Sequence, residues 1–320
     1  MDIANPIYDV VFKYLMEDND IARLIISTII KQNVISLELR PQESTVELQI
    51  GSLTVYRLDF AAKIETDQGL KTVLIEIQKA KLPTDVMRFR KYLGEQYQGE
   101  ENTYKIKVIR KHLGKMVEEE ETKAIPILSI YFLGYPLEHF HIPVIRVQRD
   151  CYNDATNERL EGREEFIECL THDSYIIQVP YLRDDQKTEV EKMLGVFDQS
   201  KKTSDHRVLN IREEEYPEKY RPIIRRLQRA ISEPGFRKKM DLEDEVIDEL
   251  KKMSRVIEQQ KEILIEAEIT REQDRAALEA KDKALEEKDK ALEAKDKALQ
   301  EKDKYIQELL KRMESPKSTV

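Results

Sequence analysis

Residues 54–78 read TVYRLDFAAKIETDQGLKTVLIEIQ, and this stretch decides the fold class. It contains two runs of mostly β-forming residues separated by the turn-forming sequence TDQG, so it predicts an antiparallel hairpin. If the middle two residues of TDQG form a tight loop, Thr66 faces Gly69, and Asp59 lies directly opposite Glu76 with the Cβ atoms about 5 Å apart. A slip of one residue would make the pairing of Asp59 with Glu76 diagonal instead.

The carboxylates of this hairpin predict a divalent-metal site. Two carboxylates that close repel each other, and both stay ionised at neutral pH only if a positive charge lies between them. Oxygen ligands without His or Cys favour Mg²⁺, Mn²⁺ or Ca²⁺ over zinc, and such an ion can activate a water molecule against a phosphodiester. The strand period of two puts Glu76 and Gln78 on one face of the sheet, and Ile77 and Lys79 on the other.

Helices and further strands are expected on both sides of the hairpin. Asn5 followed by Pro6 is typical of a helix start, and the helix that begins there carries Asp9 and Lys13, four residues apart, on one face. We further expect a second helix that ends near Ile30, a strand at 45–50, a basic helix at 85–98 and an apolar strand at 124–132.

This order of elements, a helix, a three-strand meander, a helix and a strand, resembles the PD-(D/E)XK nuclease superfamily. Over about residues 3–182 the chain also resembles the bacterial recombination-promoting nuclease and putative transposase family. The motifs that carry the resemblance are Asn5-Pro6 with Asp9, Phe12 and Lys13, then Leu58-Asp59-Phe60, then Ile75-Glu76-Ile77-Gln78. The resemblance implies an α/β fold with a restriction-endonuclease-like mixed sheet flanked by helices.

The resemblance also implies site residues. Asp59 and Glu76 would bind the metal ion, with the carbonyl of Ile77 as a third ligand, and Asp9 would act through a metal-bound water. Gln78 stands where the superfamily more often has Lys. Because an amide can neither supply a cation nor take a proton, Gln78 could only orient a water molecule or a phosphate oxygen.

Basic residues on the predicted helices are candidates for contact with nucleic acid. Lys13 and Arg88 would contact phosphate groups of DNA. The alternative is that the helix at 85–98 is simply solvated on its basic side. Since the chain has a net charge of -9, it could bind nucleic acid only through such a local basic patch.

The C-terminal quarter of the chain contains a seven-residue repeat. Residues 277–304 read ALEAKDK, ALEEKDK, ALEAKDK and ALQEKDK, which predicts one long helix of roughly 100 Å. One core position of the repeat is Leu throughout and the other is Lys. We therefore keep two alternatives open: a parallel coiled-coil dimer, and a solitary charged helix.

Composition bounds the remaining possibilities. The chain has 320 residues, of which 37% are charged, and its two cysteines are too few for a disulfide framework. No apolar stretch approaches the roughly 20 residues that cross a bilayer, so we expect a cytoplasmic protein without membrane contact. We expect a nuclease-like domain at 1–200, a linker with a short helix at 201–240, a long charged helix or coiled coil at 241–313 and a disordered tail at 314–320.

These observations favour a metal-dependent DNA endonuclease that uses Mg²⁺ (or Mn²⁺ or Ca²⁺) and forms a homo-oligomer through its C-terminal helix. The alternative function is a degenerate nuclease fold that acts as a coiled-coil protein binding nucleic acid or another partner. A transposase proper would also need strand joining and recognition of element ends, and no motif in the sequence indicates either.

Overall fold

The computed structural model describes residues 1–42, 49–50, 53–54, 59–81, 85–112, 115–183, 187–233 and 235–314. The chain divides into two compact units, Met1–Lys252 and Met253–Val320. The α-helices are α1 (Asp9–Met16), α2 (Asn19–Ile30), α3 (Asp85–Gln98), α4 (Glu165–Leu170), α5 (Glu189–Leu194), α6 (Arg221–Ile231) and α7 (Phe236–Glu314). The strands are β1 (Asp2–Ala4), β2 (Val34–Gln42), β3 (Gln49–Ile50), β4 (Leu53–Thr54), β5 (Asp59–Thr66), β6 (Gly69–Gln78), β7 (Thr103–His112), β8 (Lys115–Ala124), β9 (Ile127–Leu133), β10 (Val144–Val147), β11 (Asp173–Gln178) and β12 (Val208–Asn210).

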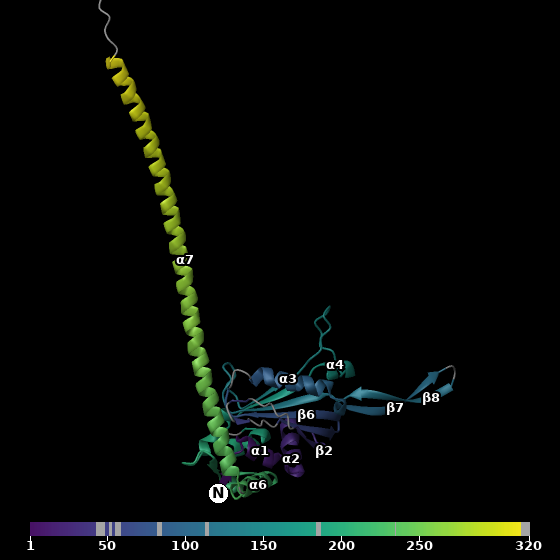
Figure 1. Ribbon diagram of the computed structural model, residues 1–320. Coiled ribbons are helices and arrows are strands. Elements are labelled where there is room, and N and C mark those ends of the chain that lie inside the picture. The colour runs from purple at the N-terminus through teal and green to yellow at the C-terminus, as the bar shows by residue number, and fades with distance from the viewer. Residues whose placement is uncertain are drawn as a thin grey trace, which may run out of the picture. The chain divides into compact units, whose positions relative to one another are not determined.

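The first unit is built around a six-stranded sheet with the order β10-β11-β9-β6-β5-β2. Strand β9 runs parallel to both β6 and β11, whereas β2, β5 and β10 are antiparallel to their neighbours. The sheet is therefore mixed, and the predicted α/β class with a mixed sheet flanked by helices is confirmed (Figure 1).

The predicted hairpin is formed by β5 and β6 in the expected register. Thr66 pairs with Gly69, and the pairing continues to Phe60 opposite Ile75. Gly69 has a φ of 107°, a conformation that glycine adopts without steric cost. Glycine at this position therefore supports the tight loop that sets the register.

Helices cover both faces of the sheet, as Figure 1 shows with α3 above the strands and α1 and α2 below them. On the α1 face, the rings of Phe12 and Phe132 pack edge to face with their centroids 5.1 Å apart. On the α3 face, Phe89 packs against Tyr131 with centroids 4.3 Å apart. Each strand residue can thus be assigned to one of two layers, one facing α1 and one facing α3.

The N-terminal helix begins later than the sequence indicated. Helix α1 starts at Asp9, and the Asn5 side chain instead accepts a hydrogen bond from the Ile7 backbone N–H at 3.2 Å. The Asn5 amide group also donates to the Gln199 side chain at 3.0 Å and to the His206 carbonyl at 2.9 Å. Asn5 therefore joins the N-terminus to a distant segment, and the residues between it and Asp9 form a turn.

Strand β2 and the ribbon of β7 and β8 are among the strands that were not predicted, as are β1, β10, β11 and β12. Strand β2 pairs with β5 at one edge of the sheet, while most of the expected strand at 45–50 lies outside the described residues. Strands β7 and β8 form a two-stranded ribbon with cross-strand ion pairs, such as Lys107 with Glu118 at 2.7 Å. These charges lie at the surface, where ion pairs contribute little to stability.

The stretch expected as a linker, 201–240, differs from that expectation because much of it is packed into the first unit. Strand β12 pairs with β1, and its Leu209 is fully buried. Helix α6, close to the expected short helix, buries Ile223, Ile224 and Leu227 completely. This spacing gives α6 an apolar stripe along one side, which attaches the segment to the core.

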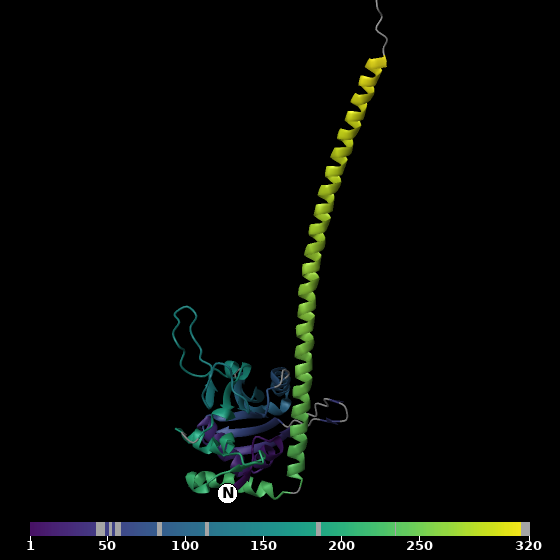
Figure 2. The same cartoon turned by 90° about the vertical axis from the view of Figure 1, so that its left-hand side faces the viewer.

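Helix α7 has 79 residues and is continuous in Figure 2. Its part from Met253 onward makes up the described residues of the second unit. The leucines of the repeat are largely exposed, at 63% for Leu278, 64% for Leu285 and Leu292, and 58% for Leu299. No helix in the described parts of the chain is both long and apolar enough to cross a membrane.

Candidate active site

The acidic and amide residues of the Glu-x-Gln motif lie at the end of β6, on the face that α3 covers. Glu76 is 3% exposed and Gln78 is 7% exposed. Glu76 lies beside Tyr131 of β9, the same ring that packs against Phe89 of α3. The motif is therefore buried between the sheet and α3.

Asp59 is the first residue of β5, and its side chain lies outside the described residues. The ladder between β5 and β6 ends at the pair of Phe60 with Ile75, and along the backbone Asp59 precedes Phe60 as Glu76 follows Ile75. Alternation assigns Asp59 to the face of Ala61, which packs in one cluster with Phe89 of α3. By the strand period alone, position 59 is therefore expected on the same face as position 76.

The Gln78 amide group is oriented by its neighbours. Its Oε1 accepts a hydrogen bond from the Tyr135 hydroxyl at 3.0 Å, and its backbone carbonyl accepts one from the Gly134 N–H at 2.7 Å. Gly134 permits this approach, since a Cβ atom there would lie 2.4 Å from the Lys79 carbonyl oxygen. With Oε1 engaged, the amide nitrogen of Gln78 donates to no described residue.

Other predicted residues lie on different elements. Asp9 and Lys13 belong to α1, which covers the face of the sheet opposite to Glu76. The backbone N–H of Asp9 donates to Glu243 Oε2 at 3.0 Å. Arg88 lies on α3, but its side chain is outside the described residues, and Ile77 packs against the core on the α1 face. Glu76 and Gln78 are thus brought together, whereas Asp9 and Lys13 lie on an element that covers the other face.

A charged cluster that sequence reasoning missed lies on the α1 face, centred on Asp244 of α7. Lys79 Nζ pairs with the Asp244 carboxylate and lies 3.4 Å from the centroid of the Tyr8 ring. The same carboxylate accepts a hydrogen bond from the Tyr8 hydroxyl at 2.9 Å. It also lies 3.0 Å from His206 Nε2 and 3.3 Å from Arg207. The lysine that directly follows Glu-x-Gln is therefore held away from Gln78.

Burial and pairing shift the proton affinities in this cluster. Burial lowers the pKa of Lys79 and raises the pKa of Tyr8. Burial alone would raise the pKa of Asp244, but the hydrogen bonds from Lys79 and His206 outweigh it and hold that pKa below its usual value. Burial raises the pKa of the neighbouring Glu243 to about 8. Asp244 is therefore the anionic member of the cluster at neutral pH, and Glu243 is largely protonated.

A cavity of about 210 Å³ lies beside this cluster. Its lining includes Lys79, Gly134 and Pro180, which lie just beyond β6, β9 and β11, together with Lys202 and His206. These three strands are parallel, so the cavity lies at their carboxyl ends. In open α/β sheets, ligands usually bind at this edge.

One sequence signal could have revealed the docking of α7. Met240 and Ile247, seven residues apart, are 5% and 8% exposed, and such spacing marks an apolar side of a helix. Asp244 lies between them, and the packing of Met240 and Ile247 places it beside the sheet.

No protein-family model, curated protein or solved structure matches the chain.

Proposed function

We propose that the chain is a metal-dependent DNA endonuclease whose active site is formed by Asp59 and Glu76 on the α3 face of the sheet. One observation carries the proposal. The register runs from Thr66 opposite Gly69 to Phe60 opposite Ile75. Continued by one residue, it would set Asp59 beside Glu76, and alternation would give the two acids one face. This pairing is what a shared divalent cation needs.

The donor chemistry of these residues fits such an ion. Asp59 and Glu76 offer carboxylate oxygens and Ile77 offers a carbonyl oxygen, the hard ligands that Mg²⁺ and Mn²⁺ prefer. Among the side chains that are described, no group of three or more His, Cys, Asp or Glu could hold a metal, so the proposed site depends on Asp59. When bound, the ion would neutralise phosphate charge and lower the pKa of a water molecule.

The protein residues would position the substrate. The Tyr135 hydroxyl donates a hydrogen bond to Gln78 Oε1. The amide nitrogen of Gln78 is then the donor that could hold a phosphate oxygen or the attacking water. Lys79 cannot replace the missing lysine of the motif, because Asp244 and Tyr8 hold it on the opposite face. We therefore expect cleavage to depend on Gln78 as a hydrogen-bond donor.

The test is a plasmid-nicking assay with Mg²⁺ or Mn²⁺. The wild-type chain should convert supercoiled plasmid to nicked or linear forms, and Asp59→Asn and Glu76→Gln should each abolish this conversion. Glu65→Gln is the matched control, since Glu65 is an exposed acid on the same hairpin. Its carboxylate accepts a hydrogen bond from the Ser36 hydroxyl. Nicking that persists in both active-site variants would reject the proposal.

The burial of the motif favours a second candidate function. Glu76 at 3% exposure and Gln78 at 7% exposure lie under α3, so a phosphodiester could reach them only if this layer opens. A catalytically degenerate fold that only binds nucleic acid would retain binding in a gel-shift assay. It would show no nicking with either metal.

We also propose that the second unit joins two copies of the chain. Leu278, Leu285, Leu292 and Leu299 recur every seven residues and are each more than half exposed in the single chain. A parallel coiled coil would cover this seam, and a dimer would provide one active site for each DNA strand.

A further inference from the structure

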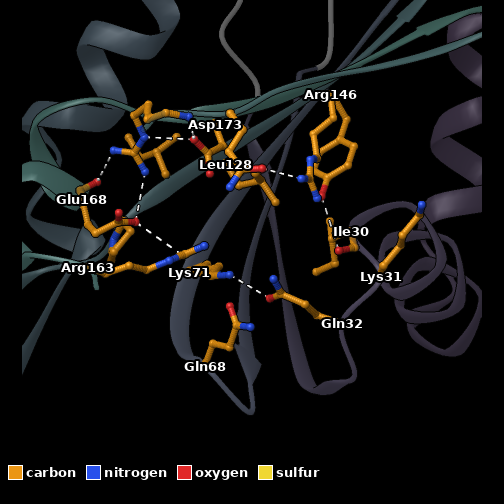
Figure 3. A pocket seen from close by; sticks show the side chains of 15 residues that line it. Ile30, Lys31, Gln32, Gln68, Lys71, Leu128, Arg146, Arg163, Glu168 and Asp173 are labelled. Atoms are coloured by element: carbon orange, nitrogen blue, oxygen red, sulfur yellow. Dashed lines mark hydrogen bonds and ion pairs between the residues drawn. The ribbon is translucent and has the colours of Figure 1, made fainter. Parts of the chain in front are cut away.

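A second cavity lies at the opposite edge of the sheet, at the amino ends of the parallel strands. It has a volume of about 190 Å³ and includes Lys71 near the start of β6, Leu128 of β9 and Asp173 of β11. Figure 3 shows that basic side chains from several elements converge on it. The basic residues of its lining are Lys31, Lys71, Arg146, Arg149 and Arg163.

The two acidic residues of the lining are already engaged. Arg149 Nε lies 3.0 Å from Asp173 Oδ1, and its Nη2 lies 3.0 Å from Glu168 Oε2. Arg163 shares the Glu168 carboxylate at 3.5 Å. Within the described part of the chain, the other three basic residues of the lining form no ion pair. Positive charge in the cavity therefore exceeds negative charge.

Lys71 is one of the three lining cations that form no ion pair within the described residues. Its Nζ donates to Gln32 Oε1 at 2.7 Å, a neutral partner. In Figure 3 the side chains of Lys71 and Arg163 reach the same part of the cavity lining. Burial lowers the pKa of Lys71, and the positive charge of Arg163 lowers it further. An anion placed between the two cations would turn this repulsion into attraction.

We propose that this cavity binds a phosphate-class anion through Lys71 and Arg163. At about 190 Å³ it exceeds the roughly 150 Å³ that holds a benzene-sized guest, but it is smaller than the roughly 300–1,000 Å³ of pockets for drug-sized ligands. A single phosphoryl group matches this size, either as inorganic phosphate or as the terminal phosphate of a longer molecule. The site is separate from Glu76 and does not depend on the proposed nuclease activity.

The proposal is tested by calorimetric titration of the full chain without divalent metal. One arm uses inorganic phosphate, and a second compares a 5′-phosphorylated oligonucleotide with its unphosphorylated form. Lys71→Gln and the half-exposed Arg163→Gln should each weaken phosphate-dependent binding by roughly tenfold or more, as expected for the loss of a charged donor. Lys63→Gln should not, since Lys63 lies on the same hairpin but on the other face of the sheet.

Each outcome decides the proposal. If the wild type binds inorganic phosphate and both variants lose this binding, the site is supported and its ligand is a free anion. Binding only of the phosphorylated oligonucleotide, lost in both variants, supports it with a terminal phosphate as the ligand. No phosphate-dependent binding in either arm, or equal binding by the wild type and both variants, overturns it. Glu76→Gln should bind as the wild type does, which separates this result from a failure of the nuclease proposal.

Discussion

Replacing Asp244 with Asn should destabilise the first unit, because four donors converge on that one carboxylate. Lys79, Tyr8, His206 and Arg207 all contact it. The substitution keeps the size of the side chain and removes its charge. Lys79 would then lie under the protein surface without its anionic partner.

The size of the effect follows from how deeply the pair is buried. Removing one partner of a fully buried ion pair costs about 3–5 kcal/mol, whereas an exposed pair contributes about 0–1 kcal/mol. The side chains of Lys79 and Asp244 are 19% and 22% exposed, so the pair is mostly buried. We expect the free energy of unfolding to fall by about 2–3 kcal/mol, which lowers Tm by about 4–12 °C for a unit of this size.

The assay is thermal unfolding of the full chain, followed by near-UV circular dichroism. The matched control is Asp248→Asn, one turn further along α7, where the side chain is 69% exposed and lies 3.9 Å from Lys251. The control should change stability by less than about 0.5 kcal/mol. Equal melting curves for the Asp244 and Asp248 variants would refute the reasoning.

The loss of stability in Asp244→Asn should also depend on pH. Because its partners hold the pKa of Asp244 below the value in the unfolded chain, its stabilisation is present at neutral pH and is lost as the pH falls through the folded value. The difference in stability between the wild type and Asp244→Asn should therefore shrink in acid. A difference that stays constant down to low pH would contradict this assignment.

Three further outcomes are expected. With its pKa raised to about 8, Glu243 should make the wild type less stable as the pH rises from 5 to 8, and Glu243→Gln should lose this slope in urea titrations at each pH. Tyr8→Phe should cost about 1–2 kcal/mol in chemical unfolding, since the buried hydroxyl donates to Asp244; an unchanged midpoint would exclude that bond. Leu285→Lys combined with Leu292→Lys should convert a dimer to a monomer by light scattering, and an unchanged mass would exclude the leucine seam as the interface.

Local patterns were sufficient to predict the hairpin and the helix after it. The TDQG turn and the alternation of the flanking runs predicted the register of β5 with β6, and α3 spans the expected residues 85–98. Strand β2 was missed although Leu37 and Leu39 alternate with polar residues, a pattern typical of a strand. Pro41 argues against a central strand and is tolerated here because β2 lies at the sheet edge. Its pairing with β5 depends on tertiary contact.

The parts that sequence reasoning missed depend on contacts between distant segments. Lys79 and Asp244 are 165 positions apart, and no local period relates them. Asn5 looked like a helix cap, yet its amide group bonds to Gln199 and His206 across the unit. The polar stretch before α6 looked like a linker, because its few buried residues, such as Leu209, are widely spaced. In each case a local preference yielded to tertiary packing.

The most direct test of the central claim is a titration of the full chain with Mn²⁺, monitored by electron paramagnetic resonance. The account predicts a single bound ion in the wild type, and an affinity reduced by roughly tenfold or more in both Asp59→Asn and Glu76→Gln, because each removes one anionic ligand. The control variant Glu65→Gln should bind as the wild type does. Wild-type affinity in both carboxylate variants, or no bound ion in the wild type, would contradict the claim that these two acids share a metal.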